Sequence, residues 1–230
     1  MIVKMDELAE TLRTRISAFN ASALLRATER RGLRWMVAEI NTGPFGTQVK
    51  QDEYVNGGVP LINPSHIVAG RLASDSKVSV SPSKARDLKR FALCVGDVVV
   101  ARRGELGRAA VVQEEDLPAI CGTGSLRVRP NCDLALPEYI YLVVSSREAV
   151  RELEQLSVGA TMGNLNERLL GEVQVPVLTI PEQRRLLAFV DEATARIDAM
   201  LAKVAELKSL LIERRAALIT DVVTGQKEVA

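Results

Sequence analysis

The chain of 230 residues is poor in aromatic side chains, histidine and cysteine. Phe, Tyr and Trp make up 3% of the sequence, which argues against an aromatic platform that stacks single-stranded nucleic acid. The one histidine, His66, and the three cysteines are too widely spaced for the paired ligands of a zinc site. An odd number of cysteines without a close pair is typical of a reduced, cytoplasmic protein. We therefore expect no metal ion in this chain.

Long apolar runs and an excess of one charge are also missing. No stretch of about 18 apolar residues is present, so no membrane-spanning helix is expected. The first residues, MIVKMDELAETLRTRI, lack the apolar core of a secretory signal. The formal net charge of +1 excludes a uniformly basic surface but leaves room for a local basic face.

Two short motifs suggest chemistry only weakly. Gly104-Glu105-Leu106-Gly107 has the outline of the loop that clamps RNA in KH modules, but a hairpin turn explains it more simply. Asn63-Pro64-Ser65-His66 has the first two residues of the Asn-Pro-Pro-aromatic motif of amino-methyltransferases, but neither of the last two. We expect no catalytic residue in this chain.

Composition and periodicity divide the chain into three segments. Residues 1–34 contain apolar residues at helical spacing and predict an amphipathic helix. Residues 35–178 alternate Gly and Pro with short β-rich runs, which indicates a mixed domain with a mostly β core and a few helices. Residues 179–230 predict a long helix. The expected fold class is therefore α+β, with one mixed domain followed by a long C-terminal coiled-coil helix.

Within the middle segment, the apolar runs predict strands at 59–62, 77–80, 97–100, 109–112, 126–128 and 172–177. One helix is expected over residues 137–156, because Pro137 suits its first turn.

The predicted C-terminal helix runs from Pro181 to about Thr224 without glycine or further proline. At a rise of 1.5 Å per residue it is about 65 Å long. Apolar residues recur at alternating spacings of three and four, a pattern that favours pairing with another helix. This predicted seam consists of Val190, Ala193, Ile197, Met200, Val204, Leu207 and Leu211.

Basic residues are concentrated in the middle segment rather than in the long helix. Between Lys84 and Arg108 there are seven bases and three acids, whereas the helix has seven of each. Such an excess can meet DNA phosphates, and polar side chains in nearby loops can read base edges. The DNA-binding candidates are Gln48, Lys50, Asn63, Lys84, Arg86, Lys89, Arg90, Arg102, Arg103 and Arg108.

The order of several segments resembles half of the specificity subunit of a Type I restriction-modification enzyme, over residues 35 to about 228. The resemblance rests on segments 43–50, 58–62, 96–112 and 159–198, and on the ending ALITDVVTGQKEV. The stretch from Leu169 through the triplet Pro181-Glu182-Gln183 is its most specific part.

This resemblance implies a single target recognition domain that contacts one half of a split, double-stranded DNA site, followed by a spacer helix. It also implies a non-catalytic subunit that recruits methyltransferase subunits, which bind S-adenosylmethionine. Motor-nuclease subunits, which use ATP and Mg²⁺, are further expected partners. No cofactor is expected in this chain itself.

The sequence departs from the family in having one recognition domain and one long helix, where a full subunit has two of each. We prefer a half-subunit that forms a homodimer, because an exposed seam would be an unfavourable apolar surface. A truncated or recombining cassette is the alternative. A different function, a coiled-coil adaptor whose globular domain binds protein, also fits the pattern.

Overall fold

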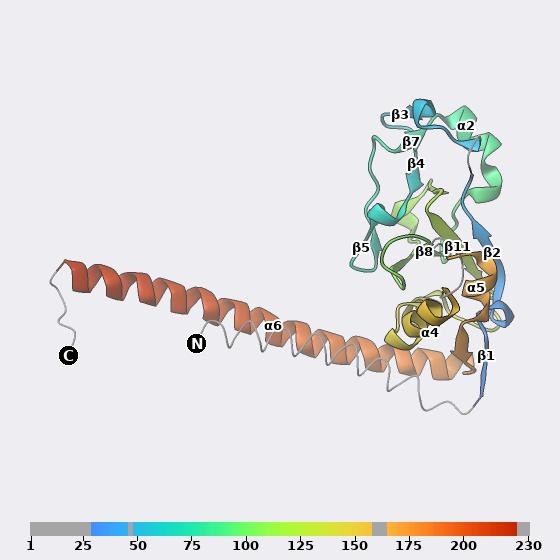
Figure 1. Cartoon of the computed structure of the whole chain (residues 1–230). Coiled ribbons are helices and arrows are strands. Elements are labelled where there is room, and N and C mark those ends of the chain that lie inside the picture. The colour runs from blue at the N-terminus through green and yellow to red at the C-terminus, as the bar shows by residue number, and fades with distance from the viewer. Residues whose placement is uncertain (1–28, 46–47, 158–164, 225–230) are drawn as a thin grey trace. The chain divides into compact units, whose positions relative to one another are not determined.

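The computed structural model describes residues 29–45, 48–157 and 165–224 (Figure 1). The chain divides between Leu187 and Ala188 into two compact units. Described residues 29–187 form one of them, here called the α+β unit, which contains every strand of the described chain. Residues 188–224 continue the long helix α6 (Ile180–Val223).

The larger sheet of the α+β unit is antiparallel and buried at its centre. Its spatial order is β2 (Val37–Thr42), β11 (Ser125–Pro130), β8 (Val98–Ala101) and β9 (Ala109–Val111). All four side chains of β8 are at most 1% exposed, because they are covered on both faces of the sheet. Helix α3 (Pro137–Val144) packs against β8, β9 and β11. This explains why β8 is a continuous apolar run instead of alternating with polar residues.

The second sheet lies beside α2 at the end of the α+β unit that is remote from α4 (Figure 1). Its spatial order is β10 (Ile120–Cys121), β4 (Val59–Ile62), β7 (Ser79–Val80) and β3 (Tyr54–Val55), with β10 and β4 parallel. Helix α2 (Pro82–Asp87) and the 3-10 turn η5 (Lys89–Phe91) follow β7. Leu88 and Phe91 are buried in one cluster with Leu61, Val80 and Ile120. This packing fixes the start of residues 84–108, here called the basic segment, to this sheet.

Short elements complete the unit. β1 (Arg30–Gly32) pairs with β12 (Gln174–Pro176), and β5 (Ile67–Val68) pairs with β6 (Arg71–Leu72). Ala69 and Gly70 both have positive φ, as a two-residue hairpin turn requires. The remaining helices and turns are α4 (Arg147–Ser157), α5 (Glu167–Glu172), η1 (Leu33–Trp35), η3 (Gln51–Glu53), η4 (Pro64–His66) and η6 (Glu114–Asp116).

Helix α6 spans 44 residues and begins inside the α+β unit. The backbone N–H and the hydroxyl of Thr179 both donate to Glu182 Oε2, at 2.8 and 2.7 Å, so the first turn is capped. This hydrogen bonding lowers the pKa of Glu182. No helix of the described residues, α6 included, is apolar enough over sufficient length to cross a bilayer.

The predicted seam of α6 lies along the boundary between two faces of the helix. Val190 is 7% exposed, and Ile197 is half-buried, whereas Met200 and Leu207 are 52% and 53% exposed. The stripe of buried or half-buried side chains runs through Val190, Thr194, Ile197, Leu201, Val204, Lys208 and Leu211. Ala193 of the predicted seam is half-buried as well, so the prediction and this stripe differ only at the exposed Met200 and Leu207.

The predicted fold class is confirmed, with differences at the level of elements. The predicted strand at 59–62 is β4, and the other five predicted runs overlap β7, β8, β9, β11 and β12. The single helix expected over 137–156 is two helices, because Ser146 Oγ accepts the Ala149 N–H and starts α4 anew. The sequence patterns did not reveal β2, α2 or α5.

The end of the predicted N-terminal helix differs as well. Residues 30–32 form β1 and pair with β12, and residues 33–35 form η1, so this part of the predicted segment 1–34 belongs to the α+β unit. Residues 1–28 of that segment lie outside the described residues.

The cysteines provide a direct test of the core. Cys121 on β10 is 1% exposed, and burial raises its pKa to about 12, whereas Cys94 and Cys132 are exposed. At pH 8 we expect Ellman's reagent to modify Cys94 and Cys132 in the folded protein but Cys121 only in urea, because the thiolate is the reacting species. Peptide mapping identifies the labelled residues, and a Cys121→Ala variant serves as the control. Equal labelling rates for all three would contradict a buried β10.

Candidate nucleic-acid interface

A buried guanidinium holds the basic segment in place. Arg127 on β11 is 3% exposed, and its Nη1 donates to the carbonyls of Arg90 and Ala92 at 3.0 and 2.8 Å. Its Nη2 donates to Glu39 Oε2 on β2 at 2.6 Å. Because the same side chain joins β11, β2 and the residues around η5, it fixes the backbone that carries Lys89 and Arg90.

A second arginine of β11 is paired beside it. Arg129 Nε and Nη2 each donate to Asp97 at 2.8 Å, and Asp97 is 1% exposed. The hydrogen bond and charge of Asp97 raise the pKa of Arg129. These two arginines are therefore structural cations, and they contribute little charge for a ligand.

Some of the candidates around α2 and η5 are exposed to solvent, and others contact neighbouring side chains. Lys84 Nζ is 2.6 Å from Glu53 Oε1, and this pairing lowers the pKa of Glu53. Arg86 and Lys89 are exposed and line one groove of about 550 Å³ with apolar residues of β4 and β10. Arg90 stacks on Phe91, with its Cζ 4.4 Å from the ring centroid.

The loop candidates are divided between exposed and structural positions. Gln48 Oε1 accepts the N–H of Phe45 at 3.0 Å and so closes its own loop. Lys50 is exposed. Asn63 is half-buried, and its Oδ1 lies where a Cβ on Gly122 would collide with it, so the contact needs glycine there.

Arg102 organises the end of β8. Its Nε donates to the carbonyl of Leu165 at 2.8 Å, and its Cζ lies 4.7 Å from the ring centroid of Phe45, which is 48% exposed. Burial and then repulsion from Arg103 lower the pKa of Arg102, and the charge of Glu167 opposes this effect. Its Nη1 has no hydrogen-bond acceptor among the described residues. Arg103 beside it is exposed.

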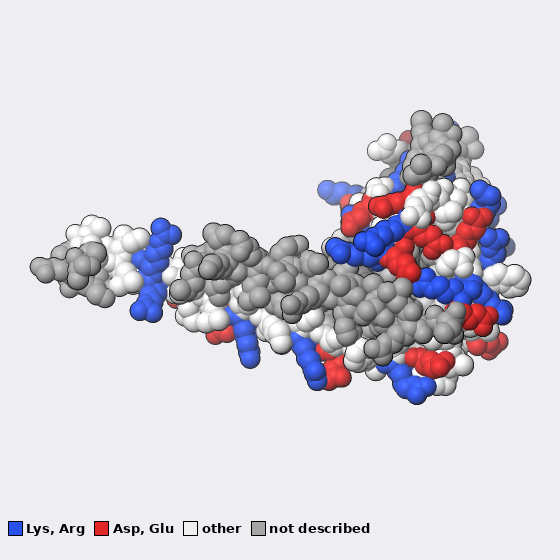
Figure 2. Space-filling model, turned by 60° about the horizontal axis from the view of Figure 1, so that its bottom comes forward, with Lys and Arg blue, Asp and Glu red and all other residues white. Residues whose placement is uncertain are grey.

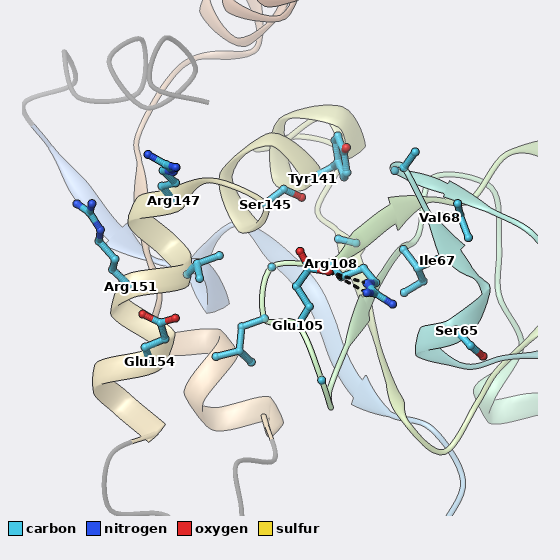
Figure 3. Close-up of a pocket in the computed structure, with 17 residues that line it drawn as sticks. Ser65, Ile67, Val68, Glu105, Arg108, Tyr141, Ser145, Arg147, Arg151 and Glu154 are labelled. Atoms are coloured by element: carbon cyan, nitrogen blue, oxygen red, sulfur yellow. Dashed lines mark hydrogen bonds and ion pairs between the residues drawn. The ribbon is translucent and has the colours of Figure 1, made fainter. Parts of the chain in front are cut away.

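A groove lies between helix α4 and the β5–β6 hairpin, with the 104–108 loop between them (Figure 3). It has a volume of about 930 Å³. Arg108 in this groove pairs with Glu105 at 2.8 Å, and its Nη1 donates to the Pro64 carbonyl at 3.3 Å. The positive charge of the candidate Arg108 is therefore partly neutralised by Glu105.

Two arginines that we did not select from the sequence also line this groove. Arg147 and Arg151 are exposed on α4, and in Figure 3 their side chains extend away from Arg108. Their spacing of four residues within a predicted helix places both on one face, and this signal was available in the sequence.

The structure therefore distributes the ten candidates rather than gathering them. One groove is lined by Arg86 and Lys89, a second by Arg90 and a third by Arg108. On the face drawn in Figure 2, basic and acidic side chains of the α+β unit are interleaved. Base contacts by Gln48, Asn63 or any arginine remain a prediction. Among the described residues, no three His, Cys, Asp or Glu side chains gather as metal ligands would.

The described chain is an α+β unit with charged loops, and the long helix α6 begins within it. Comparison with known proteins agrees. The family model for the Type I restriction modification DNA specificity domain matches residues 37–209, from β2 into α6. The chain belongs to this family.

Relatives are distant and longer. The Type I restriction enzyme StySPI specificity subunit of Salmonella potsdam is 23% identical over 181 residues, covering 76% of this chain and 37% of that protein. The EcoKI specificity subunit of Escherichia coli strain K12 is 21% identical over 209 residues, covering 84% and 43%. The chain thus spans less than half the length of these curated relatives.

Solved structures share the fold. A chain from a structural study of complex assembly and conformational transition of the type I R-M system has a TM-score of 0.73 and 17% identity, covering 94% of this chain and 53% of that one. The HsdS subunit from Thermoanaerobacter tengcongensis has a TM-score of 0.60 and 17% identity, covering 91% and 50%.

The contacts of Arg102 predict a structural role that can be separated from DNA binding. We expect Arg102→Ala to lower the free energy of unfolding by about 1–3 kcal/mol, because the Leu165 carbonyl loses its donor and Phe45 loses its stacked cation. Urea unfolding followed by circular dichroism measures this change. Arg86→Ala, at an exposed position of α2, is the control and should stay within about 0.5 kcal/mol of the parent. Equal stability of the two variants would mean that the Arg102 side chain does not support the fold.

Proposed function

We propose that this chain is the sequence-specific DNA-binding subunit of a Type I restriction-modification system and acts in the cytoplasm. In this proposal the α+β unit reads one half of a bipartite duplex target, and catalysis belongs to other subunits. The observation that carries the proposal is the family match over residues 37–209, which spans most of the α+β unit and continues into α6.

The exposed apolar side chains of α6 support a second copy as partner. Phe189 and Met200 are each 52% exposed, and further exposed apolar residues follow as far as the end of α6. The exposed set is Phe189, Met200, Leu207, Leu210, Ile212, Leu218, Ile219, Val222 and Val223. An apolar surface this long on one helix favours association, because water contact with it is unfavourable. A homodimer through α6 covers this surface.

A two-fold dimer makes a prediction about the DNA. Two identical domains related by a two-fold axis read two identical half-sites in opposite orientation, so the target is an interrupted palindrome. A helix of about 65 Å limits the gap between the half-sites to about 19 base pairs, at 3.4 Å per step. Overlap of the two helices shortens the gap further.

Partner subunits complete the proposed activity. Methyltransferase subunits supply S-adenosylmethionine chemistry, and motor-nuclease subunits, where present, use ATP and Mg²⁺. The chain contributes the choice of sequence and a surface on which the methyltransferase docks. Membership of the specificity family supports this proposed division.

Methylome sequencing tests the dimer directly. In a host that expresses this chain together with a cognate methyltransferase, we expect one methylated motif that is palindromic and interrupted by a fixed gap. The host with the methyltransferase alone is the control. A continuous or asymmetric motif would exclude the homodimer of half-subunits.

A protein-binding adaptor is the second candidate, because exposed apolar residues on α6 suit a protein partner as well as a second copy. Salt dependence separates the two functions. For a DNA reader with its methyltransferase, we expect the logarithm of the association constant to fall linearly with the logarithm of salt concentration, with a slope of about −0.9 per phosphate contacted. Fluorescence anisotropy with a labelled duplex measures this slope. Lack of DNA binding at low salt with the methyltransferase present would favour the adaptor.

A further inference from the structure

Gln183 lies in the first turn of α6 and is completely buried, at 0% exposure. Its Nε2 donates to the carbonyls of Leu134 and Leu178 at 2.8 and 2.9 Å. Its Oε1 accepts the N–H of Leu136 at 2.9 Å. Both donors of the amide and its oxygen are therefore used, and the bonded groups come from the turn before α3 and from Leu178, two residues before α6.

A second buried hydrogen bond supports the same connection. The hydroxyl of Tyr139 on α3 donates to the carbonyl of Pro176, at the end of β12, at 2.6 Å. Burial raises the pKa of Tyr139, so the hydroxyl remains a donor at neutral pH. The chain between β12 and α6 is thus bonded at both ends to α3 and the turn that precedes it.

The pattern of donors and acceptors requires glutamine. A leucine or methionine of similar size would leave two carbonyls and one N–H without the partner that they now have. A glutamate has no N–H to donate, and its ionised oxygens would face the carbonyls of Leu134 and Leu178. Glu182, next in the chain, is exposed and caps the helix instead, so the two neighbours have different tasks.

We propose that Gln183 is a positioning residue that determines how strictly the distance between the two DNA half-sites is read. The inference rests on the proposed function, in which α6 spans between two recognition domains. By bonding the first turn of α6 to the turn before α3, Gln183 keeps the base of the helix from tilting on its own domain. It acts through the helix and touches no DNA.

The length of α6 makes a small tilt at its base important. A tilt of about 10° at one end of a helix of about 65 Å displaces the other end by about 11 Å. That displacement corresponds to about three base-pair steps at 3.4 Å each. A loosened base would therefore allow several gap lengths, while the contacts within each half-site stay the same.

Binding to duplexes of different gap length tests the proposal on the full chain with its methyltransferase. The duplexes carry the two half-sites of the motif that methylome sequencing identifies. Their gap has the native length or is one or two base pairs shorter or longer. We expect the parent protein to bind about tenfold more weakly when the gap changes by one base pair, because half-site spacing is a geometric requirement. For Gln183→Met, we expect this discrimination to fall below about threefold, with native-gap affinity within about threefold of the parent.

Gln155→Met is the matched control, since Gln155 is an exposed glutamine on α4 of the same unit. It should keep the discrimination of the parent. Unchanged discrimination in Gln183→Met would overturn the inference, as would an equal loss of affinity at every gap length, which would indicate a purely structural role. A parent protein that prefers no interrupted duplex over random DNA would refute the proposed function instead.

Gln183→Glu provides a second test if Gln183→Met does not fold. A protonated carboxyl regains one donor for Leu134 or Leu178, so we expect gap discrimination to increase as the pH falls from 8 to 5.5. The parent protein, measured over the same pH range, corrects for other titrating groups. Discrimination by Gln183→Glu that does not vary with pH, relative to the parent, would overturn the inference.

Discussion

The buried amide of Gln183 is the interaction on which the architecture of this chain depends. Polar and apolar faces alone do not determine where a 44-residue helix is attached to an α+β unit. The amide of Gln183 determines this place, because its donors and acceptor match backbone groups of the turn before α3 and of Leu178. A buried polar group is tolerated only when it is satisfied, so the match defines one arrangement of the helix base.

Many of the charged side chains in the α+β unit are bonded to other groups of the protein, which leaves less charge for a ligand. Arg127 joins two strands of the larger sheet to the segment around η5, and Arg129 pairs with the buried Asp97. Arg102, Lys84 and Arg108 are each bonded to neighbouring groups as well. The basic excess of the segment 84–108 therefore overstates the charge that can meet phosphate. The DNA binding that we propose would then rely on exposed cations such as Arg86 and Lys89.

Apolar runs were predictable from the sequence whatever the length of the strand, since the run 77–80 overlaps the two-residue β7, whereas the six-residue β2 was missed. β4 and β8 are apolar runs that follow Gly58 and Gly96 closely, and α6 has no Gly and no Pro after Pro181, so the pattern of residues identified all three. Strands of two residues such as β3 and β10 carry no period, and the break between α3 and α4 depends on one serine hydroxyl. The pairing role of the α6 seam stays a prediction, because its members Met200 and Leu207 are exposed in the single chain and only a partner helix would cover them.

The sequence by itself determined the class of fold, the long helix and the resemblance to a specificity subunit, because these depend on local periodicity and on the order of motifs. The use of each charged or polar side chain was decided only by tertiary structure. Whether Arg102 supports a loop, or Gln183 fills a buried hydrogen-bond site, depends on backbone groups that are distant in sequence. Hydrogen bonds require that proximity, and a linear pattern does not contain it.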